Sequence, residues 1–322
     1  MKYVDRNGNK IVDDSSQDKL LHLLYTHMWG RVLLKPLVTP GFSGFAGRLL
    51  NTKLSTCLIP KFIKNNHIDM SCYQETEYRS FNDFFSRKIK PGARIFSPKE
   101  TDLISPCDCY ASAYRIDPAL LVNIKDTTYS VASLLRSKKL AARYTGGTLL
   151  VLRLTVGDYH RYHYPVSGIQ SKNHFIPGIL HTVNPIANDS LPIYKENTRE
   201  YTVIHSKEFG DVLQMEVGAL LVGKISNHKQ STVVTRGEEK GFFEYGGSTI
   251  VVLTQKGRVF RGEEKGYFQY GGSTIVLFFE KNAVTLRPDL AKNTRQGYET
   301  QLHLGDTLGY SPWGKDKDHS DH

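Results

Sequence analysis

The chain contains few cysteines and no long apolar run. Its 322 residues include only Cys57, Cys72, Cys107 and Cys109. Four thiols are too few for a disulfide framework in a chain of this length, and one Cys-x-Cys pair lacks the second ligand pair of a structural zinc site. We therefore expect reduced thiols and no metal. Because no apolar run reaches about 18 residues, we expect no membrane-spanning helix.

The N-terminus and the charge balance limit the expected cellular location of the protein and the classes of partner it could bind. Met1–Arg6 lacks the apolar core of a signal peptide, so we expect a cytoplasmic protein that is at most peripherally attached to a membrane. The chain has 42 Lys+Arg against 32 Asp+Glu, a net charge of +10 that favours nucleic acid or an anionic membrane surface as partner. Because the basic residues are scattered and no recognised module appears, we expect no nucleic acid.

The pattern of apolar residues changes near residue 95. Before it, the spacing predicts helices, including one with apolar residues from Leu20 to Leu34 and a short one over Phe81–Phe85 that Ser80 can cap. After it, short runs rich in Val, Ile, Thr and Tyr predict strands. We expect an α+β fold with a mainly helical, membrane-associating region (1–95) and a β-rich catalytic domain (96–322).

Four segments of the second region are the most distinctive. Strands are predicted over Thr148–Val156, Val217–Val222 and Ser248–Leu253, and a helix over Ser130–Arg136.

In the first region, the apolar face of the N-terminal helix suits either insertion among lipid headgroups or packing on the catalytic core. The sequence leaves that choice open.

The chain contains a tandem duplication. Residues 236–251 recur as residues 261–276 with 14 of 16 positions identical, at an offset of 25 residues (273 minus 248). Repeat architectures need about three or more units, so two copies indicate a local duplication rather than a solenoid. Each copy contains Tyr-Gly-Gly-Ser-Thr, with its serine at Ser248 or Ser273.

The glycine pair before each serine favours a self-reaction. Two glycines let the backbone adopt unusual angles, and they allow the serine hydroxyl to approach the preceding carbonyl without a Cβ in the way. An ordinary hairpin entry has the same signature.

Two further segments carry candidate catalytic groups. His160 and His163 flank a stretch containing Arg161, which suits an acid/base site, a phosphate clamp or a metal pair. Because side chains alternate along a strand, these histidines face opposite sides, which weakens the metal interpretation. Asp108 lies in a turn of small residues. Together, Asp, His and Ser supply the carboxylate, base and hydroxyl of an activated nucleophile.

Six segments in order resemble the signatures of bacterial phosphatidylserine decarboxylases. They are Phe81–Arg94, Ser105–Asp108, Asp158–His163, Val183–Pro185, Val217–Gly223 and Lys265–Thr274. The resemblance covers roughly residues 20–309, and six ordered motifs are far more specific than any one of them. Cys109 departs from the family pattern, which has a glycine or small polar residue after the aspartate.

The resemblance implies a proenzyme that cuts itself before a serine and converts that serine to a covalent pyruvoyl group. Asp108 and His163 then look like the relay that activates Ser248 or Ser273, and His160 looks like the residue that assists decarboxylation. The pyruvoyl group would form a Schiff base with phosphatidylserine and act as an electron sink, giving phosphatidylethanolamine. The expected product is a heterodimer of α and β chains on the cytoplasmic face of the cell membrane.

Three interpretations remain open at this point. Cleavage before Ser248 or before Ser273 would give α chains of different length, and both sites could be cut. The extra copy could instead prevent cutting and leave a processing-defective, lipid-binding member of the family. A conventional Asp-His-Ser hydrolase is a third interpretation, against which the absence of a Gly-x-Ser-x-Gly elbow argues.

Overall fold

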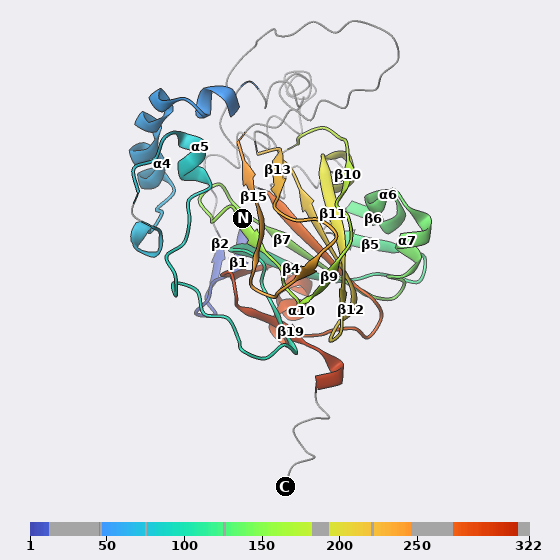
Figure 1. The fold of residues 1–322 in the computed structure, drawn as a ribbon. Coiled ribbons are helices and arrows are strands. Elements are labelled where there is room, and N and C mark those ends of the chain that lie inside the picture. The colour runs from blue at the N-terminus through green and yellow to red at the C-terminus, as the bar shows by residue number, and fades with distance from the viewer. Residues whose placement is uncertain are drawn as a thin grey trace, which may run out of the picture.

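The computed structural model describes residues 1–12, 45, 47–74, 76–124, 127–181, 193–219, 222–245 and 273–314. Strands predominate over short helices in these ranges, which confirms the expected β-rich α+β class. Figure 1 shows the strands at the centre of the molecule, α4 and α5 on one side, and α6 and α7 on the other.

One large sheet dominates the fold. Eleven strands form it, ten of them in the order β14-β9-β11-β12-β16-β7-β4-β18-β1-β2, with β10 paired to β11. The strands are β1 (Lys2–Val4), β2 (Lys10–Val12), β4 (Cys109–Arg115), β7 (Thr148–Arg153), β9 (Gly168–Gln170), β10 (His174–Ile176), β11 (Arg199–Ser206), β12 (Gly210–Val217), β14 (Val233–Val234), β16 (Thr274–Phe279) and β18 (Glu299–Leu302). All their pairings are antiparallel except that of β1 with β18.

Smaller sheets and short helices surround the large sheet. The small sheets are β13 (Lys224–Asn227) with β15 (Glu239–Glu244) and β8 (Arg161–His163), β17 (Thr285–Leu286) with β19 (Thr307–Tyr310) and β3 (Asp102–Ile104), and β5 (Leu121–Ile124) with β6 (Thr127–Ser130). The helices are η1 (Lys53–Leu58), α4 (Ile59–Asn65), η2 (Met70–Cys72), α5 (Phe81–Phe85), α6 (Val131–Leu135), α7 (Lys138–Ala142), α9 (Ile193–Glu196), α10 (Pro288–Arg295) and η3 (Pro312–Gly314).

Strand β16 runs through the middle of the large sheet and is buried along its whole length. Its side chains alternate between two cores: Ile275, Leu277 and Phe279 pack in one, and Val276 and Phe278 pack in the other. Because both faces of the strand are covered, its sequence after Thr274 is continuously apolar rather than alternating. The residue that immediately precedes β16 is therefore held in the interior.

Several predictions from the sequence are confirmed. Helix α5 begins after Ser80, whose Oγ accepts a hydrogen bond from the backbone N–H of Asp83. Helix α6 and strand β7 form where expected, and all four cysteines are free thiols. In the described ranges, no helix is long and apolar enough to cross a bilayer.

The prediction of a strand over Val217–Val222 is wrong. Strand β12 ends at Val217, and two hydrogen bonds join Ala219 to Val222. These two residues are buried and form an isolated bridge rather than part of an extended strand. The helix predicted from Leu20 to Leu34 and the strand over Ser248–Leu253 lie outside the described residues, and the division near residue 95 stays a prediction.

Candidate active site

Ser273 and His160 meet in the interior. The serine precedes β16, the histidine precedes β8, and neither side chain is exposed to solvent. Ser273 Oγ lies 3.3 Å from His160 Nδ1. The backbone carbonyl of Ser273 accepts a hydrogen bond from the N–H of Leu154, 2.8 Å away, which continues the pairing of β16 with β7. The hydroxyl is thus fixed beside an imidazole nitrogen.

The other nitrogen of His160 determines its protonation. Nε2 lies 3.0 Å from the carbonyl oxygen of Thr155, which can only accept a hydrogen bond, so Nε2 carries the proton. Nδ1 is then free of a proton and accepts from Ser273. The ring stacks on Phe85 of α5, with centroids 3.8 Å apart. Burial, with a smaller contribution from the nearby Arg87, lowers the pKa of His160 to about 3, so the ring is neutral at pH 7.

Asp158 holds the turn that presents the Thr155 carbonyl. Its Oδ2 accepts hydrogen bonds from the backbone N–H and the hydroxyl of Thr155, at 2.6 and 2.8 Å. Burial raises the pKa of Asp158 to about 6, although the bonds from Thr155 act in the opposite direction. This carboxylate therefore acts on Ser273 indirectly, through Thr155 and His160.

Arg87 fixes the other end of the same turn. Its Nη2 donates to the carbonyls of Gly157 and Asp158, at 2.8 and 3.1 Å, and its guanidinium lies 4.3 Å from the centre of the Tyr73 ring. Arg87 is 1% exposed. This buried cation holds the turn in place and also opposes protonation of His160.

His163 is the last residue of β8, and its partners differ from those of His160. Its Nδ1 donates to the carbonyl of Gly237, 2.8 Å away, while its Nε2 has no hydrogen-bond partner among the described residues. The ring lines a pocket of about 320 Å³ that also contains Lys88, Lys90 and Arg94. Burial lowers the pKa of His163.

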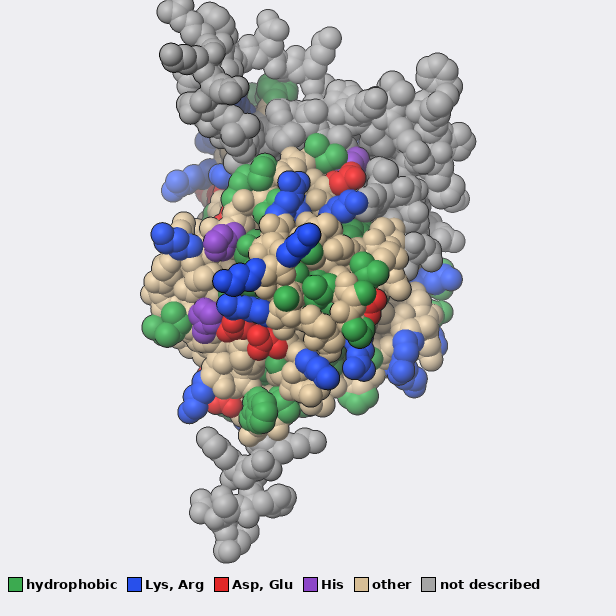
Figure 2. Space-filling model, turned by 90° about the vertical axis from the view of Figure 1, so that its right-hand side faces the viewer, with side chains coloured by type: hydrophobic (Ala, Val, Ile, Leu, Met, Phe, Trp, Pro, Cys, Tyr) green, Lys and Arg blue, Asp and Glu red, His purple; other side chains and the backbone are tan. Residues whose placement is uncertain are grey.

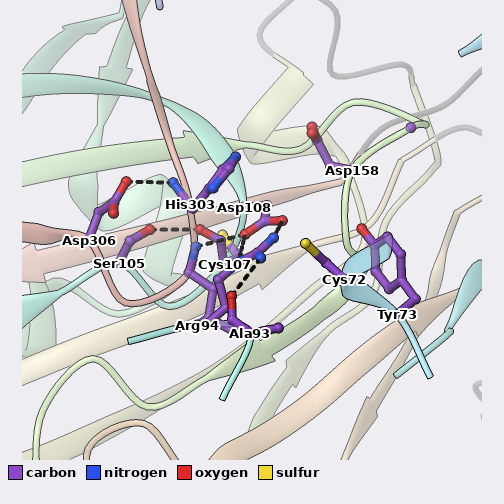
Figure 3. Close-up of polar contacts among 12 residues, drawn as sticks. Cys72, Tyr73, Ala93, Arg94, Ser105, Cys107, Asp108, Asp158, His303 and Asp306 are labelled. Carbon is purple, nitrogen blue, oxygen red and sulfur yellow. Dashed lines mark hydrogen bonds and ion pairs between the residues drawn. The ribbon is translucent and has the colours of Figure 1, made fainter. Parts of the chain in front are cut away.

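Asp108 forms an ion pair with Arg94. Figure 3 shows the guanidinium directed at both carboxylate oxygens, with Arg94 Nη2 2.7 Å from Oδ2 and Nε 3.3 Å from Oδ1. The same carboxylate accepts from the N–H of Leu304 at 2.7 Å. The ion pair raises the pKa of Arg94 further above its usual range, although burial opposes that effect.

The five residues expected at the site therefore do not form one cluster in the described structure. Ser273 and His160 are brought together, whereas no hydrogen bond among the described residues links His163 or Asp108 to Ser273 or to each other. Ser248 lies outside the described residues. Arg161, a candidate for binding phosphate, donates to Glu239 at 2.6 Å and to the carbonyl of Ser86 at 2.7 Å.

Four contributors to the site were not predicted from the sequence. Phe85 and Arg87 lie in the Phe81–Arg94 motif, and Asp158 begins the Asp158–His163 motif, so both motifs contained the signal. Their roles depend on contacts between segments far apart in the chain. Only the carbonyl of Thr155 lacks any side-chain signature, because every residue has one.

Comparison with known sequences identifies the family. The sequence profile described as phosphatidylserine decarboxylase matches residues 81–261 and 254–310. The chain belongs to the phosphatidylserine decarboxylase family. This is a family of carboxy-lyases, and the two matches overlap over residues 254–261.

Curated members of the phosphatidylserine decarboxylase family resemble the chain over most of its length. The phosphatidylserine decarboxylase proenzyme 2 of Clostridium acetobutylicum is 42% identical over 290 residues, covering 90% of this chain and 91% of the relative. The phosphatidylserine decarboxylase proenzymes of Ruminiclostridium cellulolyticum and Desulfitobacterium hafniense strain Y51 are 38% and 37% identical, covering 92% and 96% of this chain and 93% and 98% of the relatives.

Proposed function

We propose that this protein is a phosphatidylserine decarboxylase proenzyme, which cuts itself at Gly-Gly-Ser-Thr and converts phosphatidylserine to phosphatidylethanolamine. The main support is the buried hydroxyl of Ser273, held 3.3 Å from an unprotonated nitrogen of His160. A neutral imidazole in contact with a hydroxyl can take its proton at pH 7. The family of the chain gives the reaction class.

The self-cutting step needs only groups of the chain and one water molecule. As the Oγ–C bond to the preceding glycine carbonyl forms, His160 takes the hydroxyl proton and passes it to the departing amide nitrogen, so that an ester replaces the peptide bond. Loss of the Cα proton then breaks the Cβ–Oγ bond, which leaves a glycine carboxylate and an unsaturated N-terminal residue. Tautomerisation of that residue to an imine and its hydrolysis by water release ammonia and leave pyruvoyl.

His160 is well placed for the first proton transfer, and the Thr155 carbonyl keeps its tautomer correct. The alternative is the relay of Asp108 and His163, with His160 acting only in decarboxylation. In the described structure, His163 donates to Gly237 and Asp108 binds Arg94, so the relay would require both side chains to change partners. We therefore assign the proton transfer to His160.

The buried serine environment also fits the group formed from it. When bound at this position, pyruvoyl supplies an electron sink for a substrate that loses carbon dioxide. The N–H of Leu154 binds the carbonyl of Ser273, His160 contacts its hydroxyl and is itself stacked on Phe85, and burial excludes bulk water. His160 would hold or donate a proton beside the reacting carbon.

A peripheral position on the cytoplasmic face of the membrane is part of the proposal. The net charge of +10 favours attraction to anionic lipid. Figure 2 shows Lys and Arg side chains spread over one face rather than gathered in one patch, which suits a general attraction to a charged surface. The α and β chains would remain together because β16 of the α chain lies between β12 and β7 of the β chain.

The rival function is lipid binding without processing, and the duplication favours it. Intact-mass spectrometry of the purified protein distinguishes the two functions. Two fragments, the smaller one beginning with pyruvoyl, together with release of carbon dioxide from phosphatidylserine vesicles, would support the decarboxylase. A single uncut chain that binds such vesicles would refute the decarboxylase and support lipid binding without processing. Labelling of an intact serine by a phosphonate would indicate a hydrolase.

A further inference from the structure

The two described strands on either side of the Gly-Gly-Ser-Thr segment come from different copies of the duplicated segment. Strand β15 (Glu239–Glu244) belongs to the first copy, whereas β16 (Thr274–Phe279) belongs to the second. Each half has a counterpart in the other copy, 25 residues away (273 minus 248). The copies can differ in the half before the serine, in the half after it, or in both.

The half before the serine is almost the same in both copies. In β15, Lys240 is buried and its Nζ lies 2.8 Å from each carboxylate oxygen of Glu216. The second copy has Lys265 at the equivalent position. Only Phe242 and Glu244 differ, and the ion pair of Glu244 with Lys224 is partly exposed. An exposed pair contributes little, so this half does not discriminate between copies.

The half after the serine differs where burial is complete. Leu277, Phe278 and Phe279 are each 0% exposed. Their counterparts in the first copy are Val252, Leu253 and Thr254. In the register of β16, each of these is smaller than the residue it would replace, and Thr254 would also bring a hydroxyl into the core. Such replacements leave cavities and an unpaired polar group.

The mismatch continues beyond the strand. Ala283 is 7% exposed and packs in the same core as Phe279. Its counterpart in the first copy is Arg258, whose charge would have to be buried there without an assigned partner. The first copy therefore lacks the side chains that the centre of the large sheet requires.

On this basis we propose that Ser273 is the serine that is processed, and that the buried residues after it make the selection. The inference rests on the proposed function and extends it. Ser248 has the same local motif, but the residues after it, Val252, Leu253 and Thr254, are smaller than those that fill both cores behind Ser273. The products are a chain of residues 1–272, which keeps the unused Gly-Gly-Ser-Thr, and a chain of residues 273–322.

Serine variants test the choice directly by intact mass. Ser248→Ala should give the same two chains as the unaltered protein, and Ser273→Ala should stay uncut. A small chain of residues 248–322 from either the unaltered protein or Ser273→Ala would overturn the inference, yet leave the decarboxylase proposal standing. Absence of any cut in the unaltered protein would instead refute the proposed function.

A deletion tests whether the two halves seen in the structure are sufficient for processing. Removing residues 246–270 joins Tyr245 directly to Gly271 and leaves Ser273 as the only Gly-Gly-Ser-Thr serine. This shortened chain should be processed within about threefold of the full-length rate, since both halves used in the structure are kept. Failure to cut would overturn the inference, because the retained halves would then be insufficient.

The decisive comparison places first-copy residues in the shortened chain. Leu277→Val/Phe278→Leu/Phe279→Thr should reduce the processed amount at least about tenfold, because the strand loses its fit. The matched control, Glu280→Gln/Asn282→Gly, also introduces first-copy residues, but at less buried positions. It should process as its parent does. Equal processing by the triple variant and the control would overturn the inference.

Discussion

Ser273 Oγ lies 3.3 Å from His160 Nδ1 in the closed interior of the protein. The contact links β16 of the large sheet to the segment just before β8 of a small sheet. Among the described residues, His160 rather than His163 is therefore the histidine in contact with Ser273.

Substitution of the two histidines should have unequal effects on processing. His160→Ala removes the base next to Ser273 and should slow self-cutting about 100-fold or more. His163→Ala removes a side chain bonded only to the Gly237 carbonyl among the described residues, and cut chains should still accumulate. Time courses by gel electrophoresis measure both. The opposite ranking would favour the relay of Asp108 and His163.

Processing should remain fast in mildly acidic solution. An ordinary histidine, with a pKa near 6.5, would be neutral in only about one molecule in ten at pH 5.5. Burial lowers the pKa of His160 to about 3, so the base stays available. We expect the rate at pH 5.5 to lie within about threefold of the rate at pH 7.5. A tenfold fall that persists in Asp158→Asn would contradict this assignment.

Asp158 should make the folded state less stable as the pH rises. Its pKa is about 6 in the folded chain, against a model-compound value of 3.8. The folded state therefore binds the proton more tightly, and the resulting stability is present below pH 4 and lost as the pH rises through 6. The loss is about 3 kcal/mol.

The variant Asp158→Asn tests this pH dependence. Its amide oxygen can still accept from Thr155, so processing should persist, while the stability change between pH 4 and 6 should disappear. Urea unfolding in a Ser273→Ala background, which keeps a single uncut chain, measures it. Asp158→Ala should process more slowly than Asp158→Asn, because it leaves the Thr155 turn without an acceptor. An unchanged pH profile in Asp158→Asn would rule out this origin.

The ion pair of Asp108 with Arg94 should be important for stability. The side chains are 8% and 12% exposed, so Asp108→Ala leaves a shielded cation and an N–H of Leu304 without a partner. We expect a loss of about 3 kcal/mol in the free energy of unfolding. Arg6→Ala, which breaks an exposed pair with Asp306, is the control and should cost under about 1 kcal/mol. Comparable losses would contradict the structural role.

Much of the fold and part of the site could be predicted from the sequence. Apolar periodicity and capping gave α5, α6 and β7, and six ordered motifs indicated the family. Alternation along a strand predicted that His160 and His163 face opposite sides, and in the structure they contact different partners, Ser273 and Gly237. The apolar pattern failed after Val217, because apolar composition does not distinguish buried residues of a strand from buried residues outside one.

The sequence alone determined the family, the β-rich class and the chemical groups available, because these depend on residue types and their order. It could not choose between Ser248 and Ser273, since the residues around the two serines are nearly identical. Our proposal of Ser273 depends on tertiary structure: Ser273 lies beside His160, and Leu277, Phe278 and Phe279 behind it fill two cores. Packing volume is a property of the assembled sheet, and no local motif contains it.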